Sequence, residues 1–158
     1  MSRAGYADDM KIYFSAALRN GALDPKQLAE LIGFLKTQGE VLTEVLFDPK
    51  DFGARAKLTD RGICERDLQW VRSSDCVIAE VSLPSLGVGI EIQYADCLGL
   101  PILCIFNPNG SRKLSAMVTG HPRVQLVEYQ QPSDIQEAVK KFLESIRSKR
   151  SVYVLAKA

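Results

Sequence analysis

The chain has 158 residues, a length typical of one domain, and 46% of them are hydrophobic, which is enough for one sizeable core and excludes a disordered chain. With 20 Lys and Arg against 19 Asp and Glu, the formal net charge is +1. We therefore expect no binding to nucleic acid or an anionic membrane through a large basic field. No apolar run reaches the roughly 18 residues of a membrane span, and the start of the chain lacks the apolar centre of a signal peptide, so a soluble intracellular protein is expected.

Cysteine and histidine usage limits the possible chemistry. The four cysteines, Cys64, Cys76, Cys97 and Cys104, form no CxxC pair, and we interpret them as reduced core thiols. The single histidine, His121, precedes a proline in a turn-like segment. Neither a histidine-centred triad nor a multi-histidine metal site can therefore form. Catalysis, if present, must depend on carboxylates, and no metal is expected.

Short β-rich runs alternate along the chain with longer amphipathic segments. In chain order the pattern predicts a strand at 11–15, a helix at 25–38 stopped by Gly39, a strand at 41–46, a helix at 59–72, a strand at 76–81, a helix at 89–98, strands at 101–106 and 124–127, and a helix at 133–147. This alternation predicts a single α/β domain with a doubly wound, five-stranded parallel sheet of the flavodoxin or Rossmann-like type, because parallel strands need helical crossovers.

The predicted domain covers 11–147, preceded by a flexible N-terminal segment at 1–10 and followed by a C-terminal tail at 148–158. The tail contains SVYVL, which is compatible with an extra strand, a dimer contact or a frayed basic end. In a doubly wound sheet the ligand site lies at the carboxyl ends of the strands. The loops that follow the first, third and fourth predicted strands should therefore line one cleft.

The third of these strands leads into SLPSLGVGIE, which we place just before a helix N-terminus. Gly87 and Gly89 would allow close backbone approach to an anion there, although a tight turn also needs glycine for packing alone. Ser85 slightly favours the phosphate interpretation. Glu91 is expected in the first helical turn, where the dipole keeps a carboxylate ionised, so it is either a nucleophile or an ordinary first-turn glutamate.

A second carboxylate, Asp67, shares a predicted helix face with Ile63 and Trp70. Partial burial would favour its protonated form and suit it to proton donation, whereas Arg66 should point to water. The alternative is a solvated or arginine-paired aspartate. Tyr13, in the first strand, could direct its hydroxyl into the cleft or simply lie in the core. Two carboxylates and a hydroxyl beside a phosphate loop would form a site for glycosidic-bond cleavage.

Four segments carry a resemblance to a known family: AEVSLPSLGVGIEI, KLSAMVTG, GEVLTEV and ERDLQWVRSSDCVIAEV. Together they resemble the 2′-deoxynucleoside 5′-phosphate N-hydrolases, which belong to the nucleoside 2-deoxyribosyltransferase superfamily. The similarity runs from about residue 11 to 142. It implies a homodimer that hydrolyses deoxynucleoside monophosphates to a free base and 2-deoxyribose 5-phosphate without metal or organic cofactor. A location in the cytoplasm, with the nucleus as a second compartment, is expected with it.

Carried over position by position, the resemblance makes Glu91 the nucleophile and Asp67 the acid and proton shuttle at the departing base. Tyr13 would position Glu91. A 2-deoxyribosyl centre readily gains oxocarbenium character, so a fixed anion beneath it and a proton for the leaving nitrogen address both developing charges.

The remaining roles concern substrate binding. The resemblance implies that Ser85 and the Gly87 amide hold the 5′-phosphate, while Ser115 and Met117 of the LSAM segment reach in from the neighbouring subunit. The dimer would thus complete a shared active site.

The first cleft loop departs from the family pattern, which has a Gly-Ser pair followed by an aliphatic residue and arginine. Here the corresponding residues are Ala16, Ala17, Leu18 and Arg19. Leu18 keeps the apolar platform expected against the base, and Arg19 could compensate for the missing serine hydroxyl. Two other functions stay open: a deoxyribosyltransferase that exchanges bases, against which Ser85 and Ser115 argue, and a non-catalytic nucleotide-binding module.

Overall fold

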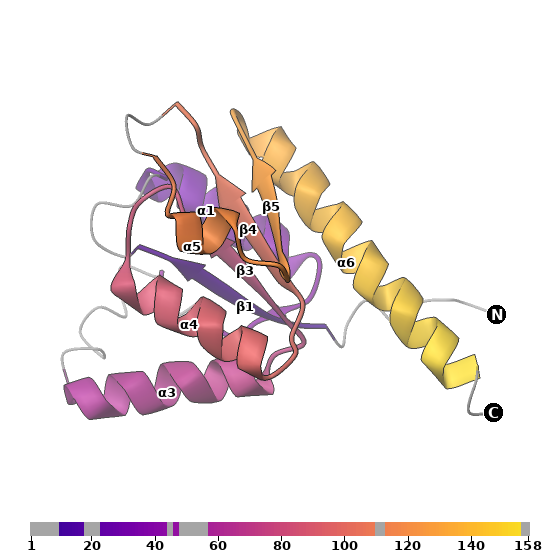
Figure 1. Cartoon of the computed structure of the whole chain (residues 1–158), viewed down its shortest axis with the longest axis horizontal. Coiled ribbons are helices and arrows are strands. Elements are labelled where there is room, and N and C mark those ends of the chain that lie inside the picture. Colours follow the sequence, from indigo (N-terminus) through magenta and orange to yellow (C-terminus); the bar gives the residue numbers. More distant parts are fainter. Residues whose placement is uncertain (1–9, 18–22, 44–45, 48–56, 110–112, 156–158) are drawn as a thin grey trace.

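Five parallel strands form one sheet in the order β2-β1-β3-β4-β5, with helices on both faces (Figure 1). The computed structural model describes residues 10–17, 23–43, 46–47, 57–109 and 113–155. The elements are β1 (Lys11–Ala16), α1 (Pro25–Lys36), β2 (Glu40–Val41), α3 (Asp60–Ser73), β3 (Cys76–Glu80), α4 (Leu86–Cys97), β4 (Ile102–Phe106), α5 (Ala116–Thr119), β5 (Val124–Glu128) and α6 (Pro132–Leu155). The single α/β domain with a five-stranded parallel sheet is therefore confirmed.

Side chains that alternate along the strands fill two separate cores. Ile12 and Ile78 point to the face covered by α1 and α6, whereas Tyr13, Val77 and Ala79 point to the face covered by α3 and α4. The chain order reverses at β1, which lies between β2 and β3. This is the switch point at which a parallel sheet opens a crevice at its carboxyl edge.

The second strand is shorter than the predicted 41–46, because its ladder with β1 covers only Glu40 and Val41. Beyond this pair the Thr43 side chain replaces the backbone ladder: its Oγ1 accepts a hydrogen bond from Phe14 N at 3.1 Å and donates one to Phe14 O at 2.7 Å. The preceding Gly39 is needed for close packing, since a Cβ there would lie 2.2 Å from Met10 O.

Helix α4 begins at Leu86, three residues earlier than predicted. Ser85 is its N-cap, and its Oγ accepts a hydrogen bond from Val88 N at 3.4 Å. Serine is a favoured N-cap because its hydroxyl accepts a hydrogen bond from an otherwise unpaired first-turn N–H. Gly87 therefore lies in the first turn, and Glu91 lies in the second turn rather than the first.

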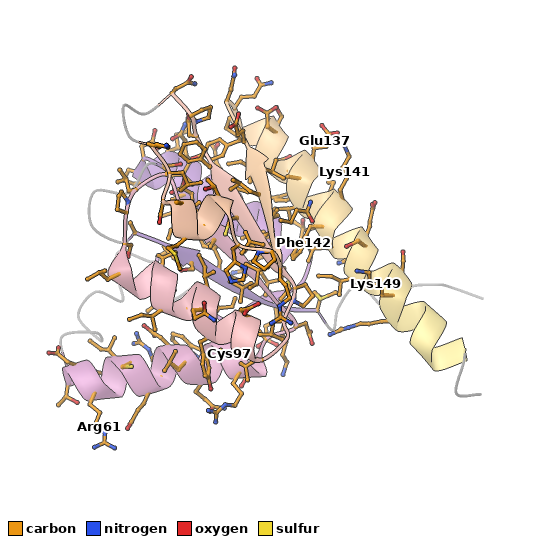
Figure 2. All side chains as sticks on the ribbon, viewed as in Figure 1. Arg61, Cys97, Glu137, Lys141, Phe142 and Lys149 are labelled. Carbon is orange, nitrogen blue, oxygen red and sulfur yellow. The ribbon has the colours of Figure 1, made fainter. Side chains whose placement is uncertain are left out.

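Helix α6 extends to Leu155 instead of ending at 147, so the interpretation of SVYVL as a strand was wrong. The Arg147 guanidinium donates a hydrogen bond to Gln38 O at 2.7 Å just before the extension, and Arg150 within it pairs with Asp75, which holds the extension against the domain. Figure 2 shows Phe142 on the side of α6 that faces the sheet, where it is buried.

Two of the four cysteines differ from the expectation of core thiols. Cys76 and Cys104 are buried in central strands, and burial raises the pKa of each thiol to about 12. Cys64 and Cys97 are exposed because they lie on the solvent sides of α3 and α4. Among the described residues, no helix is both long and apolar enough to cross a membrane.

Candidate active site

A cleft of about 410 Å³ lies at the carboxyl edge of the sheet, at the switch point beside β1. It is formed by the end of β1, the turn between β3 and α4, and the facing sides of α3 and α4. The lining residues are Tyr13, Phe14, Ser15, Ala16, Ala17, Leu46, Phe47, Ile63, Asp67, Pro84, Ser85, Gly87, Val88 and Glu91. The cleft thus brings together five of the residues predicted for the site: Tyr13, Asp67, Ser85, Gly87 and Glu91.

Glu91 projects into the cleft from the second turn of α4 and is half-buried. The Ser15 hydroxyl donates a hydrogen bond to its Oε2, and the Tyr13 hydroxyl also forms a hydrogen bond with this side chain. Both hydroxyls come from β1, two residues apart, so strand alternation places them on the same face. The carboxylate is therefore held by donors from an element other than its own helix.

Tyr13 is 1% exposed and contributes both to the core and to the cleft. Burial raises the pKa of its phenol well above the usual range. The charge of Glu91, the hydrogen bond to Glu91 and the charge of Asp67 raise this pKa further, and the charge of Arg66 lowers it. The hydroxyl therefore stays protonated and donates to the Glu91 carboxylate.

Asp67 and Ile63, one helical turn apart on α3, both line the cleft. Arg66 does not point to water as expected: its Nε and Nη2 donate to Asp67 Oδ1 at 2.9 and 2.8 Å, and its guanidinium lies 4.7 Å from the centre of the Trp70 ring. The aspartate is thus partly buried, at 14% side-chain exposure, and arginine-paired. Neither of these hydrogen bonds reaches Oδ2.

The first turn of α4 forms the polar end of the cleft. The N–H groups of a first helical turn have no carbonyl partner within the helix and, with the helix dipole, favour an anion. A Cβ at Gly87 would meet Ser85 Oγ at an ordinary 3.8 Å, and a Cβ at Gly89 would meet nothing within 4 Å. Packing within the described residues therefore does not require either glycine, which weakens the interpretation of a turn constrained by packing.

Four predicted site residues remain. Leu18 and Arg19 lie outside the described residues, so the structure does not test their placement. Ser115 caps α5, with its Oγ accepting a hydrogen bond from Met117 N at 3.3 Å, and Met117 is 79% exposed. Neither Ser115 nor Met117 is among the cleft residues of its own chain.

Sequence reasoning missed Ser15 and the apolar pair Leu46 and Phe47. Ser15 follows Tyr13 by two positions in a predicted strand, so alternation alone placed it on the same face. Phe47 packs with its ring centroid 5.2 Å from that of Phe14, but it follows a segment that the sequence pattern assigned to a longer strand. Together with Ile63 these residues give the cleft an apolar side.

A second hollow, of about 480 Å³, lies at the opposite edge of the sheet against α6. Three of its charged side chains are engaged in ion pairs, Arg150 with Asp75 and Arg123 with Asp96. In parallel sheets ligands bind at the carboxyl ends of the strands, and this hollow lies at the amino ends. The cleft at Glu91 is therefore the better candidate. No group of three or more potential metal-ligating side chains occurs within the described part of the chain.

Comparison with known proteins matches residues 12–127 to a family model described as nucleoside 2-deoxyribosyltransferase. A Syntrophotalea carbinolica protein provisionally named 2′-deoxynucleoside 5′-phosphate N-hydrolase 1 is 36% identical over 131 residues, which cover 83% of this chain and 92% of that protein. The 5-hydroxymethyl-dUMP N-hydrolase of Rattus norvegicus is 41% identical over 122 residues, covering 76% of this chain and 75% of the rat protein.

Among solved structures, the Clostridium botulinum CMP N-glycosidase superposes with a TM-score of 0.62. The alignment covers 84% of this chain and 98% of the clostridial chain at 20% sequence identity. At this identity the likeness concerns the fold. The match to the family model, by contrast, spans both the strand that carries Tyr13 and the helix that carries Glu91.

Proposed function

The chain belongs to the nucleoside 2-deoxyribosyltransferase family and is an N-glycosidase, and we propose that it hydrolyses the N-glycosidic bond of 2′-deoxynucleoside 5′-monophosphates. The observation that carries the proposal is the convergence of two carboxylates, two hydroxyls and a helix N-terminus in one cleft. These groups match the needs of the reaction: an anion at the anomeric carbon, a proton for the departing base and donors for a phosphate.

In the proposed first step a carboxylate oxygen of Glu91 attacks C1′ of the deoxyribose while the bond from C1′ to the base nitrogen breaks. Asp67 gives its proton to the base. In the second step water attacks C1′, its proton passes to Asp67, and the C1′–O bond to Glu91 breaks. The products are the free base and 2-deoxyribose 5-phosphate, and both side chains return to their starting states.

The hydrogen bonds of Asp67 support its proposed role as the acid. Arg66 holds Oδ1 with two donors and is itself positioned over Trp70. We assign proton transfer to Oδ2, because neither of the Arg66 hydrogen bonds reaches it. The apolar residues Leu46, Phe47 and Ile63 offer a surface for the base.

The proposed phosphate site uses the Ser85 hydroxyl and the Gly87 amide at the positive end of the α4 dipole. Ala17 also lines the cleft but offers no hydroxyl. Loss of one neutral hydrogen bond costs about 1 to 2 kcal/mol when nothing replaces it. Arg19 is the residue that we expect to compensate, as a cation five residues before the N-cap of α1.

We propose a homodimer in which Ser115 and Met117 of one subunit complete the cleft of the other. Three large apolar side chains support this arrangement: Leu86 is 90% exposed, Ile90 60% and Met117 79%. Leu86 lies between the cleft residues Ser85 and Gly87, so a copy that covers it must border the cleft. Sedimentation equilibrium, with Leu86→Asp as the interface variant, tests the dimer.

The activity is tested by incubating the protein with a panel of deoxynucleoside monophosphates, including 5-hydroxymethyl-dUMP, and measuring released base by chromatography. The matching ribonucleotides and unphosphorylated deoxynucleosides are controls. Hydrolysis of deoxynucleoside monophosphates is the expected result. Base exchange that outpaces hydrolysis when a second base is added would identify a transferase, and no release from any substrate would favour a binding module.

A further inference from the structure

We infer that Ser15 is a positioning residue for Glu91, acting with Tyr13 as a pair of hydroxyl donors that keep the carboxylate ionised and aimed into the cleft. This inference rests on the proposed function, because it assigns Ser15 a role through the proposed nucleophile. The hydrogen bond from Ser15 Oγ to Glu91 Oε2 joins β1 to α4 across 76 residues of sequence.

The placement of Ser15 supports a specific contact. Its side chain is 4% exposed and lines the cleft beside Tyr13, so its hydroxyl is shielded from bulk water and faces the polar groups of the site. In the register of β1 with β3, Tyr13 lies opposite Val77 and Ser15 opposite Ala79. This register determines how near each hydroxyl lies to the carboxyl edge of the sheet. The opposite residues on β3 are small and apolar, and the hydrogen bond of the Ser15 hydroxyl goes to Glu91 on α4.

The Ser15 hydroxyl also differs in role from the serine that the family pattern has at the position of Ala17. Ser15 donates to Glu91, whereas a hydroxyl two residues later would lie beyond the end of β1, beside the proposed phosphate site. Ser15 therefore does not replace the missing phosphate ligand. Its hydrogen bond bears on the reactivity of Glu91 rather than on affinity for the phosphate.

Polar and charged side chains from two neighbouring elements surround this carboxylate. Ser15 and Tyr13 donate hydrogen bonds from β1, and Asp67, paired with Arg66, lines the same cleft from α3. Hydrogen bonds to the charged form of a carboxylate favour that form. Removal of the Ser15 donor should therefore let Glu91 take up a proton at higher pH than in the unmodified protein.

The experiment compares pH profiles of kcat/KM for the unmodified protein and Ser15→Ala, with a deoxynucleoside monophosphate as substrate. We expect kcat/KM at neutral pH to fall roughly tenfold, mostly in kcat, as when one neutral hydrogen bond is lost. The acidic limb of the profile should move to higher pH by up to about one unit. Ser15→Thr keeps the hydroxyl, so its acidic limb should lie at the same pH as that of the unmodified protein.

Thr43→Val is the matched control, because Thr43 is a fully buried hydroxyl that contacts β1 through the backbone of Phe14 and not Glu91. It should lower thermal stability without moving the acidic limb. If Ser15→Ala fails to fold by circular dichroism, Ser15→Cys, a weaker donor of similar size, provides the same readout.

An acidic limb that coincides with that of the unmodified protein in a folded Ser15 variant would overturn the inference. The proposed function is tested separately by Glu91→Gln. If Glu91→Gln keeps its turnover, the proposed nucleophile is wrong, whereas an inactive Glu91→Gln beside an unshifted Ser15→Ala rejects only the role of Ser15.

Discussion

Two glutamates at the carboxyl edge of the sheet have the same kinds of partner but different surroundings. Glu91 receives hydrogen bonds from the hydroxyls of Ser15 and Tyr13. Glu80, the last residue of β3, receives them from Ser82 and from the Tyr129 hydroxyl at 3.1 Å. A serine, a tyrosine and a glutamate thus meet twice, once on each face of the sheet.

Access distinguishes the two clusters. Glu91 is half-buried and lines the cleft, whereas Glu80 is 1% exposed and Tyr129 is 4% exposed. Burial raises the pKa of the Glu80 carboxyl, and its hydrogen bonds with Ser82 and Tyr129 only partly oppose that effect. A buried carboxyl group that is not among the cleft residues serves the structure, while an accessible one is available for chemistry.

The Glu80 cluster holds together the edge on which the cleft lies. Ser82 Oγ accepts a hydrogen bond from Asn107 N at 2.8 Å, so the cluster ties the ends of β3, β4 and β5 to one another. Ser82 is also the start of the turn that leads to the α4 N-cap. The comparison therefore predicts that changes at Glu91 affect activity and changes at Glu80 affect stability.

The largest effect is expected for Glu91→Gln, which removes the negative charge but keeps the shape of the side chain. Loss of a covalent nucleophile should lower kcat by at least about a thousandfold. The urea midpoint should change little. Glu80→Gln is the matched control, an identical substitution in the other cluster, and it should retain most activity. Comparable loss in both variants would contradict the division of roles between the clusters.

A smaller loss of kcat is expected for Asp67→Asn, because general acid catalysis accelerates a reaction by about 100- to 10,000-fold. Substrates with better leaving bases need less protonation and should be less affected. Rates of base release across a series of substituted uracil deoxynucleotides measure this dependence. An equal loss with every base would count against Asp67 as the acid.

Ser115→Ala should have a more modest effect, raising KM for a monophosphate more than it lowers kcat, since it removes a contact shared by ground and transition states. The matching unphosphorylated deoxynucleoside should be little affected. Mixing Glu91→Ala subunits with subunits altered at Ser115 and Met117 should restore some activity through hybrid dimers with one intact site. Exchange of subunits without recovery would assign Ser115 only to the capping of α5.

The smallest effect on activity is expected in the Glu80 cluster, where the readout is stability. Because burial raises the pKa of Glu80 in the folded protein, the folded chain binds more protons than the unfolded chain above the ordinary glutamate pKa of about 4.3. Stability therefore falls as the pH rises through the raised pKa. Glu80→Gln should flatten this fall in urea denaturation between pH 5 and 8. Tyr129→Phe should cost about 1 kcal/mol. If Glu80→Gln leaves the slope of stability against pH unchanged, the pH dependence does not arise from Glu80.

The sequence by itself predicted the parallel sheet and the edge at which the cleft lies, because the alternation of apolar runs with amphipathic segments permits few other arrangements. The order of helices and strands follows this pattern, and Tyr13, Asp67, Ser85, Gly87 and Glu91 line one cleft as expected. The boundaries of β2 and α4 did not follow from the pattern. They depend on side-chain hydrogen bonds of Thr43 and Ser85 that apolar periodicity does not encode.

Tertiary structure decided which hydroxyl meets which carboxylate. Ser15 reaches Glu91 across 76 residues, and Tyr129 reaches Glu80 across 49. Periodicity assigns a side chain to one face of the sheet. A hydrogen bond also requires that the two side chains lie at matching positions along the strand and along the helix packed on that face. Those follow from strand register and from packing of the two cores, so only the folded chain distinguishes the accessible glutamate from the buried one.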